Sequence, residues 1–353
     1  MVSIKILLLW LACSFTLCSC QVGYLLNNAY HQGRILKRAV PIDDVLKNES
    51  VNTDVKKKLI LAQEAKKFAE DFLKLKKTKN YSTYVQLDGP YVTYVVSAAP
   101  KNELTYYTWW FPIVGSVPYK GYFKPEPADE LAKELQTQNL DTYVRGVSAF
   151  STLGWFRDPV LSSMVNYQDI DLVNTIIHET VHATLYISGN ANFNERLATY
   201  LGDLGTRLFY QQKGEELFKQ VAQTIQDDEF DQKIFTEFIS AEIKKLEEWY
   251  KIHKNDSDLL LSRELQFSTI KQNFLTAIKA KLKTKRYVNF DKAEINNARL
   301  LGFKLYLNDL SDFQKLNEHF KSDFNRILDY YKSLEDEKDP EASLKTFTNS
   351  IKL

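Results

Sequence analysis

The chain has 353 residues, of which 44% are hydrophobic and 26% are charged. This composition predicts a globular protein with a substantial core, organised as one large domain or two closely packed ones. The formal net charge of +1 offers no broad basic surface, so the composition argues against nucleic acid as a partner.

The first twenty residues, MVSIKILLLWLACSFTLCSC, contain an early lysine, an apolar run from Ile6 to Leu17 and then small residues. A membrane-spanning helix needs about 20 apolar residues, so this shorter run is typical of an export signal, which we place at residues 1–19. All three cysteines of the chain lie in this stretch. The mature chain therefore has no pair of thiols for a disulfide.

The end of the signal, Leu-Cys-Ser-Cys20, resembles a bacterial lipoprotein box, in which the last cysteine carries the lipid. The alternative is an ordinary cleaved signal in which Cys20 is incidental. An unmodified Cys20 would leave an exposed thiol near the mature terminus, so we favour lipidation. The sequence thus predicts an exported bacterial lipoprotein that is attached to a membrane of the cell envelope through Cys20.

The next part of the chain is predicted to change from helices to strands. Residues 20–83 are expected to form a lipid-anchored helical segment, with an apolar stripe at helical spacing up to about Lys79. From Tyr84 to Phe123, β-branched and aromatic residues alternate with Gly and Pro, which predicts a strand-rich region. We expect this region to begin a catalytic unit at residues 84–210.

A short helix is expected from Pro127 to Gln138, and one or two strands from Asp141 to Phe156. The part of this strand from Val144 to Ser151 could hold an extended peptide by β-addition. Residues 211–353 are almost wholly helical in pattern, with apolar stripes at helical spacing. We interpret those stripes as core packing.

Another helix is predicted to begin near Asp169. Asp169 can cap it, and Asp171 would favour the positive end of the helix dipole. Its apolar face consists of Leu172, Val173, Ile176, Ile177 and Val181.

This helix contains the motif HETVH. His178 and His182 are four residues apart, so their side chains lie on the same helix face and can bind one metal ion. Glu179 lies about a hundred degrees around the helix, beside the metal, where it can take a proton from metal-bound water. The alternatives are a chance match and two core histidines with hydrogen-bonded rings.

A third ligand is expected at Glu195, in a second helix from Phe193 to Leu204 that folds back after the turn SGNAN. The alternative is a capping box, with Asn192 as the cap and Glu195 as its N3 carboxylate. Next to HExxH we favour the ligand. Two histidines and one glutamate leave a coordination position open, which indicates a catalytic Zn²⁺ site. Leu185 and Ser188 stand where a metzincin would have glycine and histidine, so that class is excluded.

Several stretches resemble, in order, the bacterial family of predicted zinc aminopeptidases, which are lipoproteins of the HExxH class. They cover nearly the whole mature chain and read CQVGYLL, FPIVGSVPYKGYF, VRGVSAFSTLGWFRDPVLSSM, HETVHATLY, FNERLATYLGDLG and INNARLLGFKLYLNDLSDF. The resemblance implies a gluzincin-like site with His178, His182 and Glu195 as zinc ligands and Glu179 as the base.

We therefore expect an α+β, zincin-like fold that is predominantly helical, with a small β-sheet beside the HExxH helix. The expected activity is zinc-dependent hydrolysis of peptides, by an aminopeptidase. The alternative is a non-enzymatic envelope lipoprotein whose metal site staples two helices or binds a partner. Tyr306, Tyr119 and Tyr122 lie in family-like motifs and are weak candidates for stabilising the oxyanion, since most tyrosines are packed aromatics.

Overall fold

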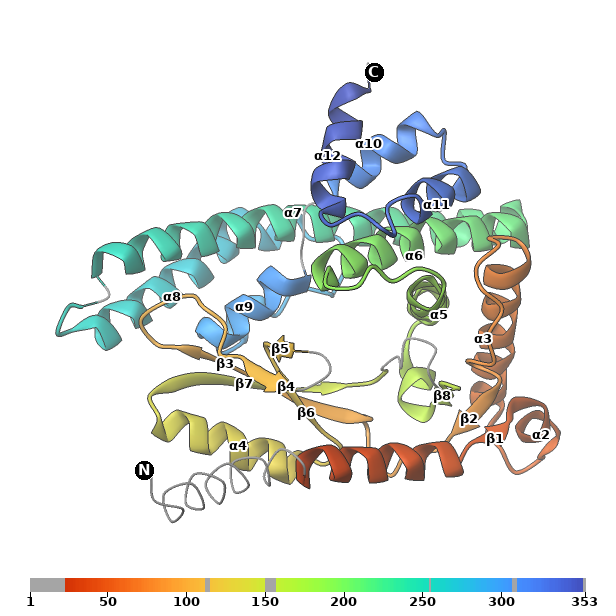
Figure 1. Cartoon of the computed structure of the whole chain (residues 1–353), viewed down its shortest axis with the longest axis horizontal. Helices are drawn as coiled ribbons and strands as arrows, with labels where there is room; N and C mark the ends of the chain where they lie inside the picture. Colours follow the sequence, from red (N-terminus) through yellow and green to blue (C-terminus); the bar gives the residue numbers. More distant parts are fainter. Residues whose placement is uncertain (1–22, 112–114, 150–156, 254, 307–309, 352–353) are drawn as a thin grey trace, which may run out of the picture.

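A computed structural model describes residues 23–111, 115–149, 157–253, 255–306 and 310–351. The signal segment 1–19 and Cys20 lie outside these residues. Most of the described chain is helical, and the strands are short, which confirms an α+β protein (Figure 1). Within the described residues, no helix is long and apolar enough to cross a membrane.

The N-terminal part is less continuously helical than expected. Residues 23–37 are helical, and then strand β1 (Val40–Pro41) interrupts before α2 (Ile42–Lys47) and α3 (Thr53–Asp71). Pro41 and the turn residues before Asn52 break the pattern, and the Asn52 side chain caps α3 by accepting from the Asp54 N–H. Helix α3 ends before the charged stretch in which Lys74 adopts a positive φ of 57°.

The strands form three small sheets among the described residues. In the first, β1 pairs with β2, and β2 pairs in parallel with β8; the second has the order β6-β3-β7, and the third is the hairpin of β4 and β5. The bounds are β2 Thr83–Val85, β3 Thr93–Pro100, β4 Trp109–Phe111, β5 Gly115–Val117, β6 Lys120–Tyr122, β7 Leu140–Val147 and β8 Val160–Leu161.

The sheet of β6, β3 and β7 lies between two helices. Helix α4 (Pro125–Thr137) packs on β3 and β7 from one side, and α9 (Asn297–Tyr306) packs on the same strands from the other (Figure 1). The expected helix before β7 is therefore confirmed, and so is the first half of the expected strand. The second half includes residues 150–156, which lie outside the described residues.

The helix that carries HETVH is α5 (Asp169–Thr184), and its five expected apolar residues are all fully buried. The expectation that Asp169 caps it is wrong: Asp169 is already the first helical residue, Gln168 precedes it, and no side chain caps the start. Asp169 instead pairs with Lys58 of α3 at 2.6 Å. The main neighbours of α5 are α3 and the following helix, α6 (Ala191–Lys213).

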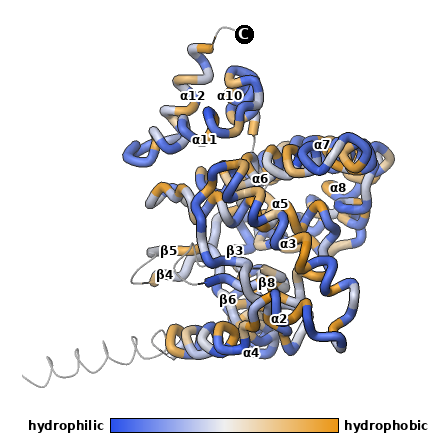
Figure 2. Tube along the Cα trace, turned by 90° about the vertical axis from the view of Figure 1, so that its right-hand side faces the viewer, coloured by the Kyte–Doolittle hydropathy of each residue, from blue (hydrophilic) through white to orange (hydrophobic). Residues whose placement is uncertain are grey.

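Helices α3 and α5 lie against each other, and both carry hydrophobic residues (Figure 2). They belong to one hydrophobic cluster that continues into α6 and the C-terminal helices. The predicted helicity after residue 211 is confirmed, with α7 running along one side of the molecule (Figure 1). The bounds are α7 Glu215–His253, α8 Leu259–Ala277, α10 Ser311–His319, α11 Phe324–Lys332 and α12 Pro340–Ser350, with short 3-10 turns at Ser162–Asn166, Lys279–Lys281 and Phe290–Lys292.

Candidate metal centre

Three side chains from α5 and α6 converge at one point. Their possible ligand atoms, on His178, His182 and Glu195, all lie within 4.8 Å of one another. The two histidine Nε2 atoms are 3.1 Å apart, and the Glu195 carboxylate lies 3.7 Å from His178 Nε2 and 3.5 Å from His182 Nε2. The spacing predicted from HExxH, and the helix that returns across it, therefore bring these three residues together.

These distances fit one tetrahedral zinc ion. With metal–ligand bonds of about 2.1 Å, neighbouring ligands of a tetrahedral site are about 3.4 Å apart. The three separations, 3.1, 3.5 and 3.7 Å, lie close to that value. The donor set of two imidazole nitrogens and one carboxylate is also the set of catalytic zinc sites with an open fourth position.

The geometry of α6 rejects the capping-box alternative for Glu195. The helix begins at Ala191 after Asn190, so Asn192 is inside the first turn and Glu195 is the fifth helical residue. Glu195 consequently does not occupy the N3 position that a capping box requires.

The connection between α5 and α6 is fixed by a buried amide that the sequence analysis missed. The Asn194 side chain accepts from the Ile187 N–H at 2.9 Å and donates to the Ile187 carbonyl at 2.8 Å. Gly189, with φ of 79°, allows the turn between them. Because Asn194 precedes Glu195, this pair of bonds holds the start of α6 against the end of α5. No local sequence signal separates such an asparagine from an ordinary helix-start residue.

The electrostatics of the cluster favour its metal-binding forms for two of the three groups. Burial and the neighbouring His182 lower the pKa of His178 to about 4, so its ring is neutral at pH 7. Burial raises the pKa of Glu195, but the hydrogen bond and charge of His182 outweigh it and the net pKa is lowered. For His182, burial lowers the pKa, yet the hydrogen bond and charge of Glu195 and the charge of Glu179 raise it overall.

The two histidines differ in how deeply they lie and in how their other ring nitrogen is held. The His182 side chain is 4% exposed and that of His178 is 19% exposed. A backbone hydrogen bond with Ala198 of α6 orients the His178 ring. The buried Nδ1 of His182 has no partner among the described residues.

Glu179 is not one of the converging ligand atoms. Its charge acts on His182, and it also acts on the buried phenol of Tyr81 and the partly buried phenol of Tyr167, raising the pKa of each alongside the larger effect of burial. Glu179 therefore lies beside the cluster, with aromatic residues near it.

The predicted oxyanion tyrosines have their described contacts elsewhere. Tyr119 lines a pocket beneath α9, and Tyr122 packs edge-on against Tyr24 at 5.6 Å. The side chain of Tyr306, at the end of α9, lies outside the described part. Tyr186, which was not predicted from the sequence, lies with its ring 6.3 Å from that of His182, and its pKa is raised by burial and then by the charge of Glu195.

The fold and the cluster together define a mostly helical α+β protein with a two-histidine, one-glutamate constellation on two packed helices. The family model described as "Putative aminopeptidase" matches residues 23–345, and the chain belongs to this family. No curated protein and no solved structure matches the chain.

Proposed function

We propose that the protein is a zinc-dependent peptidase with a gluzincin-like site on a zincin-like fold, in which His178, His182 and Glu195 bind one Zn²⁺. The observation that carries the proposal is the convergence of these three donors at separations suited to one tetrahedral ion. Membership of an aminopeptidase family supports peptides as the substrates.

At His178, His182 and Glu195, a bound Zn²⁺ would supply Lewis-acid chemistry that activates water and polarises the scissile carbonyl. Glu179 takes the proton of the attacking water and delivers it to the leaving amine. Two features support this role: Glu179 neighbours a ligand on α5 without joining the ligand group, and its charge reaches His182.

The strand β7 is suited to holding the peptide. It is at the edge of its sheet among the described strands, so one side of its backbone is open to pairing. Just after β7, the Ser148 carbonyl accepts a hydrogen bond from the Ser163 hydroxyl, which fixes the end of this strand against the turn before α5.

The test is to load purified protein with zinc and offer it matched peptides with free and acetylated N-termini. We expect one zinc per chain, cleavage that a chelator abolishes, and a preference for the free amine. Equal cleavage of acetylated peptides would contradict the aminopeptidase assignment. Zinc binding without cleavage across a broad panel would instead favour a lipoprotein in which the metal staples α5 to α6.

We further propose that the protein is exported and anchored by lipid at Cys20, as the signal-like start and the lipoprotein box suggest. Mass spectrometry of the mature N-terminus should find a lipidated Cys20, and Cys20→Ala should lose both the lipid and membrane partitioning. An unmodified cysteine at the mature terminus, or cleavage at another site, would contradict the anchor.

A further inference from the structure

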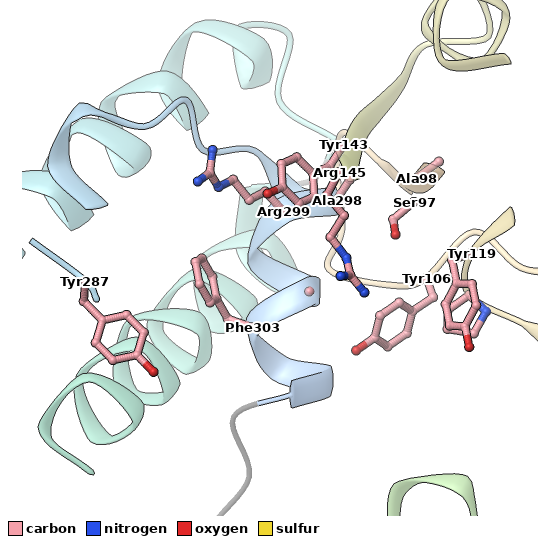
Figure 3. Close-up of a pocket in the computed structure, with 12 residues that line it drawn as sticks. Ser97, Ala98, Tyr106, Tyr119, Tyr143, Arg145, Tyr287, Ala298, Arg299 and Phe303 are labelled. Atoms are coloured by element: carbon pink, nitrogen blue, oxygen red, sulfur yellow. The ribbon is translucent and has the colours of Figure 1, made fainter. Parts of the chain in front are cut away.

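A pocket of about 270 Å³ lies between α9 and the strands β3 and β7 (Figure 3). Two arginines line it, Arg145 from β7 and Arg299 from α9, and its described lining includes no aspartate or glutamate. Figure 3 shows the Arg145 guanidinium directed into the space between α9 and Tyr106. The lining thus combines two positive charges, which favours an anionic ligand.

The rest of the lining is aromatic and small. Phe303, Ala98 and Ala298 offer apolar surface, and the phenols of Tyr106 and Tyr119 also line the pocket, the Tyr106 hydroxyl donating to the Leu301 carbonyl at 3.1 Å. The Arg299 guanidinium lies over the Tyr143 ring at 5.0 Å and donates to the Glu294 carbonyl at 2.9 Å. These contacts hold one arginine in place, so the charge at that end of the pocket is pre-positioned.

A glycine in α9, Gly302, leaves the pocket open because it has no side chain. Gly302 is in the interior of α9, where glycine is among the least favourable residues. A Cβ added there would meet nothing within 4 Å, and Gly302 lines the pocket. The helix therefore carries a glycine at the point where any side chain would enter the cavity.

The pocket shares a strand with the proposed peptide-binding edge. Tyr143 and Arg145 line the pocket from β7, and the outer edge of β7 is the edge proposed above to hold an extended peptide. A peptide that lies along β7 would therefore run beside the pocket, where its C-terminal residue can enter.

We propose that this pocket binds the C-terminal residue of a short peptide, with its carboxylate at Arg145 and an apolar side chain over Gly302 and Phe303. The assignment of the ligand to a peptide rests on the proposed peptidase function. A free apolar carboxylic acid shares the same chemistry, so the experiment must separate these two sources.

The experiment measures binding, by calorimetry or ligand-observed NMR, on full mature protein in the Glu179→Gln background so that no probe is cleaved. The probes are N-acetyl-phenylalanine, the tripeptide Ala-Ala-Phe, and the C-terminal amide of each. For N-acetyl-phenylalanine, a ligand of this size, we expect a Kd on the order of 1 mM. Each acid should bind at least tenfold more tightly than its amide, and the tripeptide should bind several-fold more tightly than N-acetyl-phenylalanine.

Two variants and two matched controls locate the site. Gly302→Leu fills the pocket and Arg145→Gln removes a charge, so each should weaken binding of the acids at least tenfold. Gly33→Leu changes another helical glycine with open space around it, and Arg326→Gln removes an arginine on α11 that stacks on Phe320. Both controls should bind like the parent protein.

Equal binding of acid and amide, or unchanged binding by Gly302→Leu, would overturn the pocket proposal. A tripeptide that binds no more tightly than N-acetyl-phenylalanine would overturn the peptide as its source and leave a free acid. These outcomes do not depend on turnover. If the wild type binds the peptides but does not hydrolyse them, the proposed peptidase function is contradicted. If it hydrolyses peptide acids and their C-terminal amides equally well, only the pocket proposal is contradicted.

Discussion

Glu195 is the site residue for which the sequence leaves two roles open. Its sequence context allows either a helix-capping carboxylate or a metal ligand, because both need a glutamate shortly after a turn. The helix start argues against the cap, since Glu195 is the fifth residue of α6, and its carboxylate lies 3.5 Å from His182 Nε2, where a metal ligand is expected.

The first prediction tests this residue. Glu195→Ala should weaken zinc binding at least about a hundredfold, since removing even an outer-shell partner of a ligand costs roughly 10–100-fold. The free energy of unfolding of the metal-free protein should change little, because no cap is lost. Metal titration and thermal melting measure both. Glu215→Ala, which removes a carboxylate that is 81% exposed on α7, is the control. Full zinc occupancy in Glu195→Ala would remove Glu195 from the site.

The HExxH histidines were predictable because their spacing and their helix depend on local sequence. The partners that orient them were not. Asn194 bonds to Ile187, and Ala198 bonds to the His178 ring, through contacts that exist only once α6 lies against α5. Tyr186 follows His182 by four residues, but it comes after the helix ends at Thr184, so helical periodicity could not have placed it.

At the scale of elements, the site depends on how closely α6 approaches α5. A Cβ at Gly202 would lie 3.3 Å from His178 Cβ, and one at Gly205 would lie 2.9 Å from Ile177 Cγ2 and 3.0 Å from Leu73 Cδ1. Both glycines therefore let α6 pack without a gap against α5, and Gly205 also against Leu73, which follows α3.

The second prediction concerns this contact. Gly205→Ala forces the packed side chains apart, which typically costs roughly 1–3 kcal/mol. The gain in helix propensity of about 1 kcal/mol offsets part of that cost. Gly302→Ala gives the same gain in α9 with open space around the new Cβ, so it is the matched control. Chemical denaturation should find Gly205→Ala less stable than Gly302→Ala, and the reverse order would contradict the close packing.

A carboxyl group between the same two helices should make the stability of the protein depend on pH. Asp203 of α6 accepts a hydrogen bond from Asn174 of α5 at 2.8 Å, and burial raises its pKa from 3.8 to about 7. Between pH 3.8 and about 7, the folded protein keeps a proton on the Asp203 carboxyl that the unfolded chain releases. The free energy of unfolding should therefore fall as pH rises across this range.

Asp203→Asn removes that proton, so its unfolding free energy should fall less than that of the wild type between pH 4 and about 7. Denaturation at several pH values measures the slope. Asp256→Asn, at an exposed position, should keep the wild-type slope. A wild-type slope in Asp203→Asn would show that another group causes the pH dependence.

For the whole molecule, long elements were easier to predict than their arrangement. The helices after residue 211 and the strand β7 follow from periodicity over many residues. The division into three small sheets does not, because strands such as β8 have two residues and pair with partners far along the chain, as Tyr84 does with Val160. The packing of α5 between α3 and α6 likewise arises from burial of a common hydrophobic cluster.

The central claim is that Glu179 acts as the base of a zinc-dependent peptidase, and Glu179→Gln tests it most directly. The substitution preserves size and leaves both histidines and Glu195 free to bind zinc. Turnover of a peptide that the wild type cleaves should fall by a factor of roughly a hundred to ten thousand. Zinc content and melting temperature should stay near those of the wild type, with Glu215→Gln as the surface control. Equal turnover by zinc-loaded Glu179→Gln would contradict this account.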